Sequence, residues 1–103
     1  MKEDLLKIIE HFGVIHQVKK LNEECYEFIE AVRDYQEQLA LNGYDVEKVD
    51  KCFEECVIEE FADVNVVLEQ FKAYFDLRND LIIDEMKFKI KRTIEEEVEN
   101  EDI

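Results

Sequence analysis

The chain has 103 residues, of which 28 are acidic and 13 basic, giving a formal net charge of −15. This length predicts one domain over residues 1–103 with a modest core, and a hydrophobic content of 47% is too high for a disordered acidic tail. The negative charge argues against binding to nucleic acid polymers or anionic membranes, because both require basic side chains to meet phosphate groups. Acidic chains instead suit divalent cations, basic partners or simple solubility.

The cysteines and the N-terminal segment indicate the cellular compartment. Cys25, Cys52 and Cys56 are an odd number and lack the spacing of a disulfide framework or of a zinc site. The first residues do not form the apolar core of a signal peptide, and no run reaches transmembrane length. The sequence therefore predicts a reduced, cytoplasmic protein.

The first half of the chain predicts two helices. There is no proline, and the two glycines, Gly13 and Gly43, are expected to mark helix ends. Apolar residues at helical spacing predict a short helix over residues 5–12 and a long one over 14–41. The long helix carries an a/d seam of alternating three- and four-residue steps, formed by Val14, Val18, Leu21, Cys25, Phe28, Val32, Tyr35 and Leu39.

The second half predicts two more helices after a turn over residues 42–45. The third helix is expected over 46–75, with a weak or kinked start, and its apolar stripe consists of Phe53, Val57, Phe61, Val64, Leu68, Phe71 and Phe75. The fourth is expected over 81–98. Acids oppose the dipole at a helix C-terminus, so the tail over 95–103 is expected to fray. No strand-like alternation is sustained, and the predicted fold is all-α: an antiparallel bundle of about four helices, completed by self-association.

Glu60 is the most informative single residue, because it lies among apolar neighbours on the third predicted helix. A carboxylate in a packed face costs several kcal/mol unless a basic side chain or a cation compensates it. A buried pair with Lys20 or Arg33 is the simplest structural explanation. The alternative is a metal site shared with other acids.

Two acidic pairs favour the metal site. Glu24 and Glu27 lie three residues apart on one helix, and Glu60 and Asp63 lie three apart on another, so each pair shares one helix face. Antiparallel packing of the two long helices can bring both pairs together. Carboxylates that converge either stay partly protonated or bind a hard cation, and oxygen ligands are those that Mg²⁺ and Mn²⁺ prefer.

These residues also carry a resemblance. The segment Leu21-Asn22-Glu23-Glu24-Cys25-Tyr26-Glu27, followed by Glu60-Phe61-Ala62-Asp63, resembles the EExxE…ExxD signature of MazG-like nucleoside triphosphate pyrophosphohydrolases. Phe12-Gly13 with Gln17 is similar to the aromatic-Gly…Gln segment that precedes the first acids in that family. Lys89-Ile90-Lys91-Arg92-Thr93 is similar to the Lys-x-x-Arg-Thr segment of its last helix. The segment over residues 34–55 does not align with the family.

The resemblance implies an all-α enzyme that hydrolyses a (deoxy)nucleoside triphosphate to the monophosphate and pyrophosphate with Mg²⁺ or Mn²⁺. It implies a homodimer or homotetramer with sites near the subunit contacts. Carried over to this chain, the metal ligands are Glu24, Glu27, Glu60 and Asp63, and Glu23 is the catalytic or water-orienting acid. Gln17, Lys89 and Arg92 are the expected substrate-binding residues.

A different class of function also fits the composition. The chain can be a non-catalytic acidic helical module that binds a basic partner or mimics the charge of a nucleic acid. For Lys89 and Arg92, an ordinary pair of surface side chains explains the sequence equally well, and Gln17 reads equally well as an exposed helical glutamine. Convergence of the acids distinguishes the two classes, since the interaction module needs acids spread over its outer surface.

Overall fold

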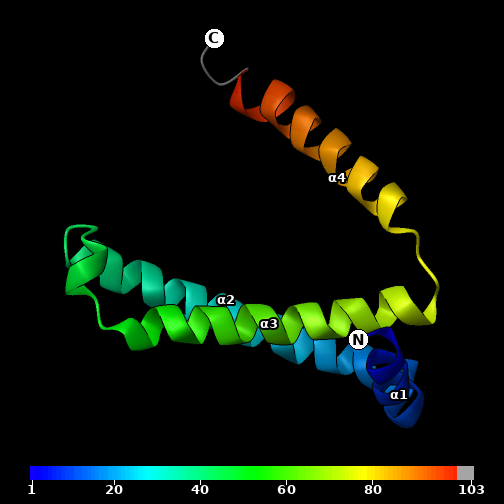
Figure 1. The fold of residues 1–103 in the computed structure, drawn as a ribbon. Coiled ribbons are helices and arrows are strands. Elements are labelled where there is room, and N and C mark those ends of the chain that lie inside the picture. The colour runs from blue at the N-terminus through cyan, green and yellow to red at the C-terminus, as the bar shows by residue number, and fades with distance from the viewer. Residues whose placement is uncertain (100–103) are drawn as a thin grey trace.

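The computed structural model describes residues 1–99, and all of their regular structure is helical (Figure 1). The elements are α1 (Lys2–Phe12), α2 (Val14–Leu41), the 3₁₀ turn η1 (Val46–Lys48), α3 (Lys51–Tyr74), α4 (Asn79–Thr93) and the π-helical turn η2 (Ile94–Val98). Residues 1–99 contain no strand, which confirms the predicted all-α class. No described helix is both long and apolar enough to cross a membrane.

Local chemistry explains where the helices begin and end. Gly13 separates α1 from α2 with a φ of 89°, and Gly43 follows α2 with a φ of 65°; both values favour glycine. The third helix starts later than predicted because Asp50 caps it: the Asp50 Oδ1 accepts a hydrogen bond from the Cys52 backbone N at 2.9 Å. The weak start that the sequence indicated is the separate turn η1.

Three helices pack together and the fourth does not. Helices α2 and α3 run antiparallel along most of their length, and α1 folds back at one end to contact both (Figure 1). Helix α4 leaves the end of α3 and projects away, with no substantial packing on α1, α2 or α3. Within residues 1–99, the bundle therefore consists of three helices, α1, α2 and α3.

The contact between α2 and α3 is centred on different residues from the predicted seams. The most buried positions of α2 are Gln17, Glu24 and Ala31, each seven residues from the next, so they lie on one line. Those of α3 are Val67 and Gln70. Residues of the predicted apolar stripes lie beside this line and are half-buried or exposed; Phe61, for example, is 57% exposed.

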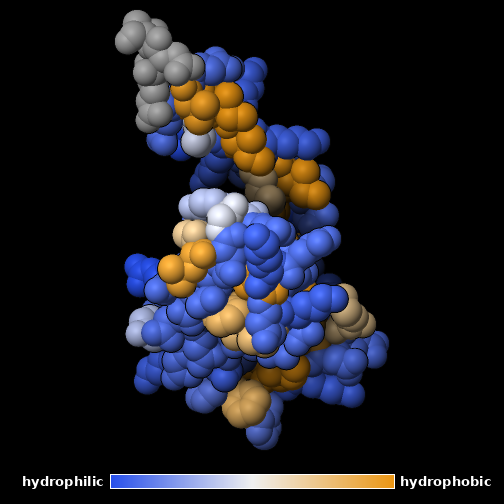
Figure 2. All heavy atoms as spheres, turned by 90° about the vertical axis from the view of Figure 1, so that its left-hand side faces the viewer, coloured by the Kyte–Doolittle hydropathy of each residue, from blue (hydrophilic) through white to orange (hydrophobic). Residues whose placement is uncertain are grey.

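Hydrophobic side chains lie open along α4, as Figure 2 shows above a mostly hydrophilic body. They are Leu81, Ile83, Met86, Phe88 and Ile90, followed by Ile94 and Val98 of η2. The tail over residues 95–103 was expected to fray, but its first part is helical, because η2 continues the helix to Val98. Residues 100–103 lie outside the described residues.

Candidate metal centre

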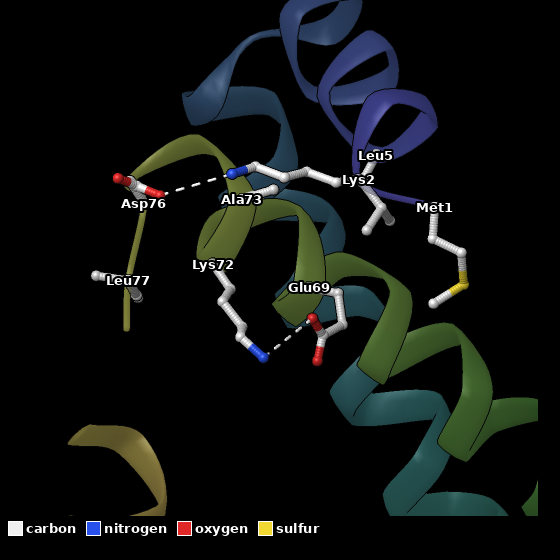
Figure 3. Close-up of a pocket in the computed structure, with 8 residues that line it drawn as sticks. All are labelled: Met1, Lys2, Leu5, Glu69, Lys72, Ala73, Asp76 and Leu77. Carbon is white, nitrogen blue, oxygen red and sulfur yellow. Dashed lines mark ion pairs between the residues drawn. The ribbon is translucent and has the colours of Figure 1, made fainter. Parts of the chain in front are cut away.

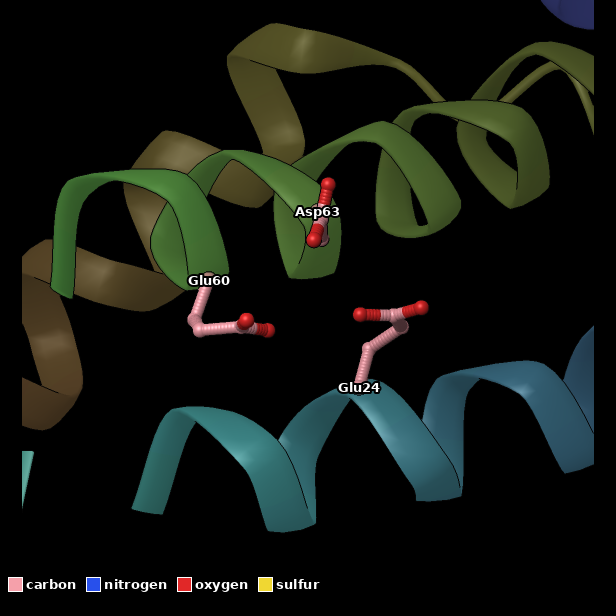
Figure 4. Close-up of side chains that lie close together, drawn as sticks. All are labelled: Glu24, Glu60 and Asp63. Carbon is pink, nitrogen blue, oxygen red and sulfur yellow. The ribbon is translucent and has the colours of Figure 1, made fainter. Parts of the chain in front are cut away.

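Three of the predicted metal ligands meet between the two long helices. Glu24 projects from α2, and Glu60 and Asp63 project from α3, so that the three carboxylates face a common space (Figure 4). One oxygen from each lies within 4.8 Å of the others. The i,i+3 spacing of Glu60 and Asp63 puts both on the face that meets α2.

Glu24 is the most enclosed of the three, with 6% of its surface exposed. Its Oε1 forms an ion pair with Lys20 Nζ at 2.9 Å, one turn earlier on α2. This contact with Glu24 raises the pKa of Lys20. The second oxygen of Glu24, Oε2, is buried and has no hydrogen-bond partner. Lys20, which was considered from the sequence as a partner of Glu60, therefore pairs with one oxygen of Glu24 instead.

Glu60 has no basic partner among the described ion pairs. Its Oε2 is buried and unpaired. Burial raises the pKa of Glu60, and the charges of Glu27, Asp63 and Glu24 and a hydrogen bond with Glu27 raise it further. Every neighbouring charge that acts on this carboxyl thus disfavours its ionised form.

The other two predicted acids lie at the edge of this group. Glu27 is exposed on α2, but its carboxyl lies within hydrogen-bonding reach of Glu60. Glu23 is also exposed on α2, and its charge acts on Lys20. Glu24, Glu60 and Asp63 therefore converge, Glu27 lies beside Glu60, and Glu23 is exposed at the edge of this group.

The donor set fits a hard divalent cation. The three residues offer carboxylate oxygens, which are the donors that Mg²⁺ and Mn²⁺ prefer, and Glu24 and Glu60 each keep one buried oxygen without a partner. Asp63 is exposed, so the site is open on one side to water and to a ligand. A cation there would relieve the repulsion that raises the pKa of Glu60.

A cavity of about 440 Å³ adjoins the carboxylates, with Glu24 and Asp63 in its wall. Gln17, predicted from the sequence to bind substrate, lines it and is 4% exposed, so it is not an ordinary surface glutamine. Its Nε2 donates a hydrogen bond of 2.7 Å to Oε1 of Gln70, which is 2% exposed. His16 and Phe12 form another part of the wall, with rings stacked at 5.0 Å between centroids.

Lys89 and Arg92 lie on α4, away from the carboxylates of the same chain (Figure 1). Lys89 lines a groove at the start of α4, and the Arg92 guanidinium lies 5.8 Å from the centroid of the Phe88 ring. Since α4 does not pack on α2 or α3, these basic side chains do not join the acidic group within one chain.

A second cavity, of about 270 Å³, lies where α1 meets the end of α3 (Figure 3). Its charged side chains are already paired: Lys2 Nζ lies 3.6 Å from Asp76 Oδ1, and Lys72 Nζ lies 3.6 Å from Glu69 Oε2. None of the predicted site residues lines it. The carboxylates and the cavity beside them are therefore the better candidate site.

Sequence reasoning did not identify Gln70. The signal for Gln70 was present, since it lies seven residues after Asp63 and three after Val67, on the buried face of α3. Comparisons of the chain with family models, with curated proteins and with solved structures found no match.

Proposed function

We propose that the protein is a Mg²⁺-dependent hydrolase that converts a (deoxy)nucleoside triphosphate to the monophosphate and pyrophosphate. One observation carries the proposal: Glu24 and Glu60 each hold a buried carboxylate oxygen without a partner, within one group of acids between α2 and α3. An acidic surface for a basic partner would instead place its carboxylates in water, where they need no compensation.

In this proposal Glu24, Glu27, Glu60 and Asp63 hold the cation, for which Mn²⁺ can substitute. When bound, the cation supplies charge neutralisation for the phosphate oxygens. Glu23, exposed beside Glu24, orients the attacking water and accepts its proton. Gln17 lies two turns before Glu24 on α2, about 10 Å along the helix axis, and contacts the part of the substrate beyond the phosphates.

The proposal includes a second copy of the chain as a partner. Helix α4 exposes apolar residues such as Met86 (55% exposed) and Ile90 (57% exposed) and packs on no other helix of its own chain. Helix α4 carries four basic and three acidic side chains, so it is weakly positive in a chain of net charge −15. Exposed apolar residues on α2 and α3, such as Phe61 of α3, offer a surface on which α4 of another copy can pack. This packing would bring Lys89 and Arg92 of one copy toward the carboxylates of the other.

The test is pyrophosphate release from a panel of canonical and damaged nucleoside triphosphates in the presence of Mg²⁺. The expected result is equal release of pyrophosphate and monophosphate from at least one member, lost on chelation and restored by Mn²⁺. Glu60→Gln should abolish turnover with an unchanged circular dichroism spectrum. The matched control, Glu59→Gln, changes an exposed neighbour and should keep activity.

Metal binding is tested separately by thermal unfolding. Low concentrations of Mg²⁺ or Mn²⁺ should raise the melting temperature of the wild type well beyond the effect of monovalent salt, because a ligand that binds only the folded state stabilises it. If monovalent salt substitutes for Mg²⁺ and the folded protein releases no pyrophosphate from any nucleotide, the enzyme is excluded. The non-catalytic acidic interaction module is then the remaining function.

A further inference from the structure

The cavity beside the carboxylates has two kinds of wall. One part is aromatic: the Phe12 and His16 rings are stacked with an interplanar angle of 17°, and Phe12 keeps 51% of its surface exposed. An exposed aromatic face is a platform on which a flat heterocycle stacks. The other part is polar and almost fully enclosed, formed by the side-chain amides of Gln17 and Gln70.

The hydrogen bonds of the two amides run in one direction. Gln17 Nε2 donates to Gln70 Oε1 at 2.7 Å, so the oxygen of Gln17 faces His16, whose Nδ1 lies 2.9 Å from it. Because an amide oxygen only accepts, His16 Nδ1 is the donor in this contact. His16 therefore donates to Gln17, and Gln17 donates to Gln70.

This chain of hydrogen bonds ends on a donor. Gln70 Oε1 is engaged by Gln17, whereas Gln70 Nε2 has no hydrogen-bond partner in the part of the chain that the structure describes. The Nε2 atom is also absent from the fully enclosed unpaired atoms, so it keeps a small accessible surface, and Gln70 lines the cavity. A ligand that fills the cavity must offer an acceptor there or leave a buried N–H unpaired, which is costly.

From this geometry we propose that the cavity is a base-binding pocket that selects nucleotides whose base carries an oxo group at the position where a counterpart base carries an amino group, with Gln70 as the specificity-determining residue. The proposal rests on the proposed function, because the shared wall of Glu24 and Asp63 is what connects a base in this cavity to phosphates at the carboxylates. A carbonyl oxygen accepts the free Gln70 N–H, whereas an amino group brings a second donor to it.

The test compares matched ligands that differ only at the oxo or amino edge of the base. These are the α,β-methylene triphosphate analogues of inosine and adenosine, and those of uridine and cytidine, titrated in Mg²⁺ by calorimetry. The analogues are not cleaved between the α and β phosphates, so binding is measured without turnover. In each pair the oxo nucleotide should bind about tenfold more tightly, the size expected for one buried hydrogen bond.

Variants at Gln70 identify the residue responsible. Gln70→Glu replaces the free donor with an acceptor and should reverse the preference within each pair, and Gln70→Met, of similar shape, should abolish it. If burial of a carboxylate prevents Gln70→Glu from folding, Gln70→Met decides the question alone. The matched control is Gln36→Glu on the exposed side of α2, which should keep the wild-type preference.

The outcomes separate this inference from the proposed function. Pyrophosphate release with no oxo preference, or with a preference that Gln70→Met leaves intact, overturns the base pocket and leaves the hydrolase standing. An oxo preference that depends on Gln70, without pyrophosphate release, supports the pocket and overturns the hydrolase. Absence of binding by all four analogues to folded protein overturns the pocket.

Discussion

Glu60 shows what a single residue reveals from sequence alone. Its position among apolar neighbours predicted a carboxylate that needs compensation, and the structure places its carboxyl group beside Glu24 and Asp63 with one buried oxygen unpaired. The same reasoning did not identify Gln70, because burial of an amide among apolar residues costs less free energy than burial of a carboxylate and is a weaker signal of a site. It also did not anticipate that Lys20 would pair with one oxygen of Glu24.

The raised pKa of Glu60 predicts how stability depends on pH in metal-free protein. The folded state holds this proton above the ordinary carboxyl pKa of 4.5. The contribution of Glu60 to stability is therefore fully present below that value and is lost as pH rises through the raised folded pKa. Glu60→Gln removes this loss and should be more stable than the wild type at neutral pH in the presence of a chelator.

The measurement is urea unfolding of both proteins, without metal, from about pH 4 to about pH 8. The stability difference in favour of Glu60→Gln should grow with pH and disappear when Mg²⁺ stabilises only the wild type. Glu59→Gln, a control at an exposed position, should show no such growth. A constant difference between Glu60→Gln and the wild type would mean that the Glu60 proton is not linked to folding.

At the scale of helices, the sequence predicted the limits of α2 correctly, because Gly13 and Gly43 interrupt an otherwise continuous helical pattern. The buried face of each long helix was harder to predict. Hydrophobicity favoured the line through Val18 and Val32, yet both are exposed while Gln17 and Ala31 are buried. Hydrophobicity alone does not show which of two adjacent stripes on a helix packs against the neighbouring helix of the same chain.

The docking of α1 depends on Ile9, which has no exposed surface. Ile9→Ala should destabilise the protein by about 2–5 kcal/mol, through lost burial and the cavity left behind. Ile15→Ala, at a residue 72% exposed just beyond Gly13, should change stability by less than about 0.5 kcal/mol. Urea unfolding monitored by circular dichroism measures both. Equal effects of the two substitutions would mean that α1 is not held against α3.

At the scale of the whole molecule, the number of helices was predictable and the position of α4 was not. Its amphipathic pattern indicated that one face is covered, but in the single chain none of the three bundled helices covers it. Exposed apolar residues of this extent mark interaction surfaces in soluble proteins. We propose that a second copy of the chain covers this face.

Self-association through α4 is tested by charge. The double variant Met86→Glu, Ile90→Glu places two carboxylates on the exposed apolar face of α4. In sedimentation velocity, this variant is expected to be a monomer and the wild type a dimer or tetramer. The double variant should also lose the concentration dependence of its melting temperature. The control, Glu85→Gln, changes charge on the same helix and should keep the wild-type assembly. A monomeric wild type would rule out the second copy.

The junction between α1 and α2 at Gly13 has a thermodynamic consequence for the cavity. One residue, with φ 89° and ψ 153°, joins α1 to α2, while the cavity wall draws Ile8 and Phe12 from α1, Gln17 from α2 and Gln70 from α3. Any molecule that touches all three helices must therefore favour the docked position of α1. By reciprocity, the free energy with which α1 docking favours binding equals the free energy with which binding favours docking.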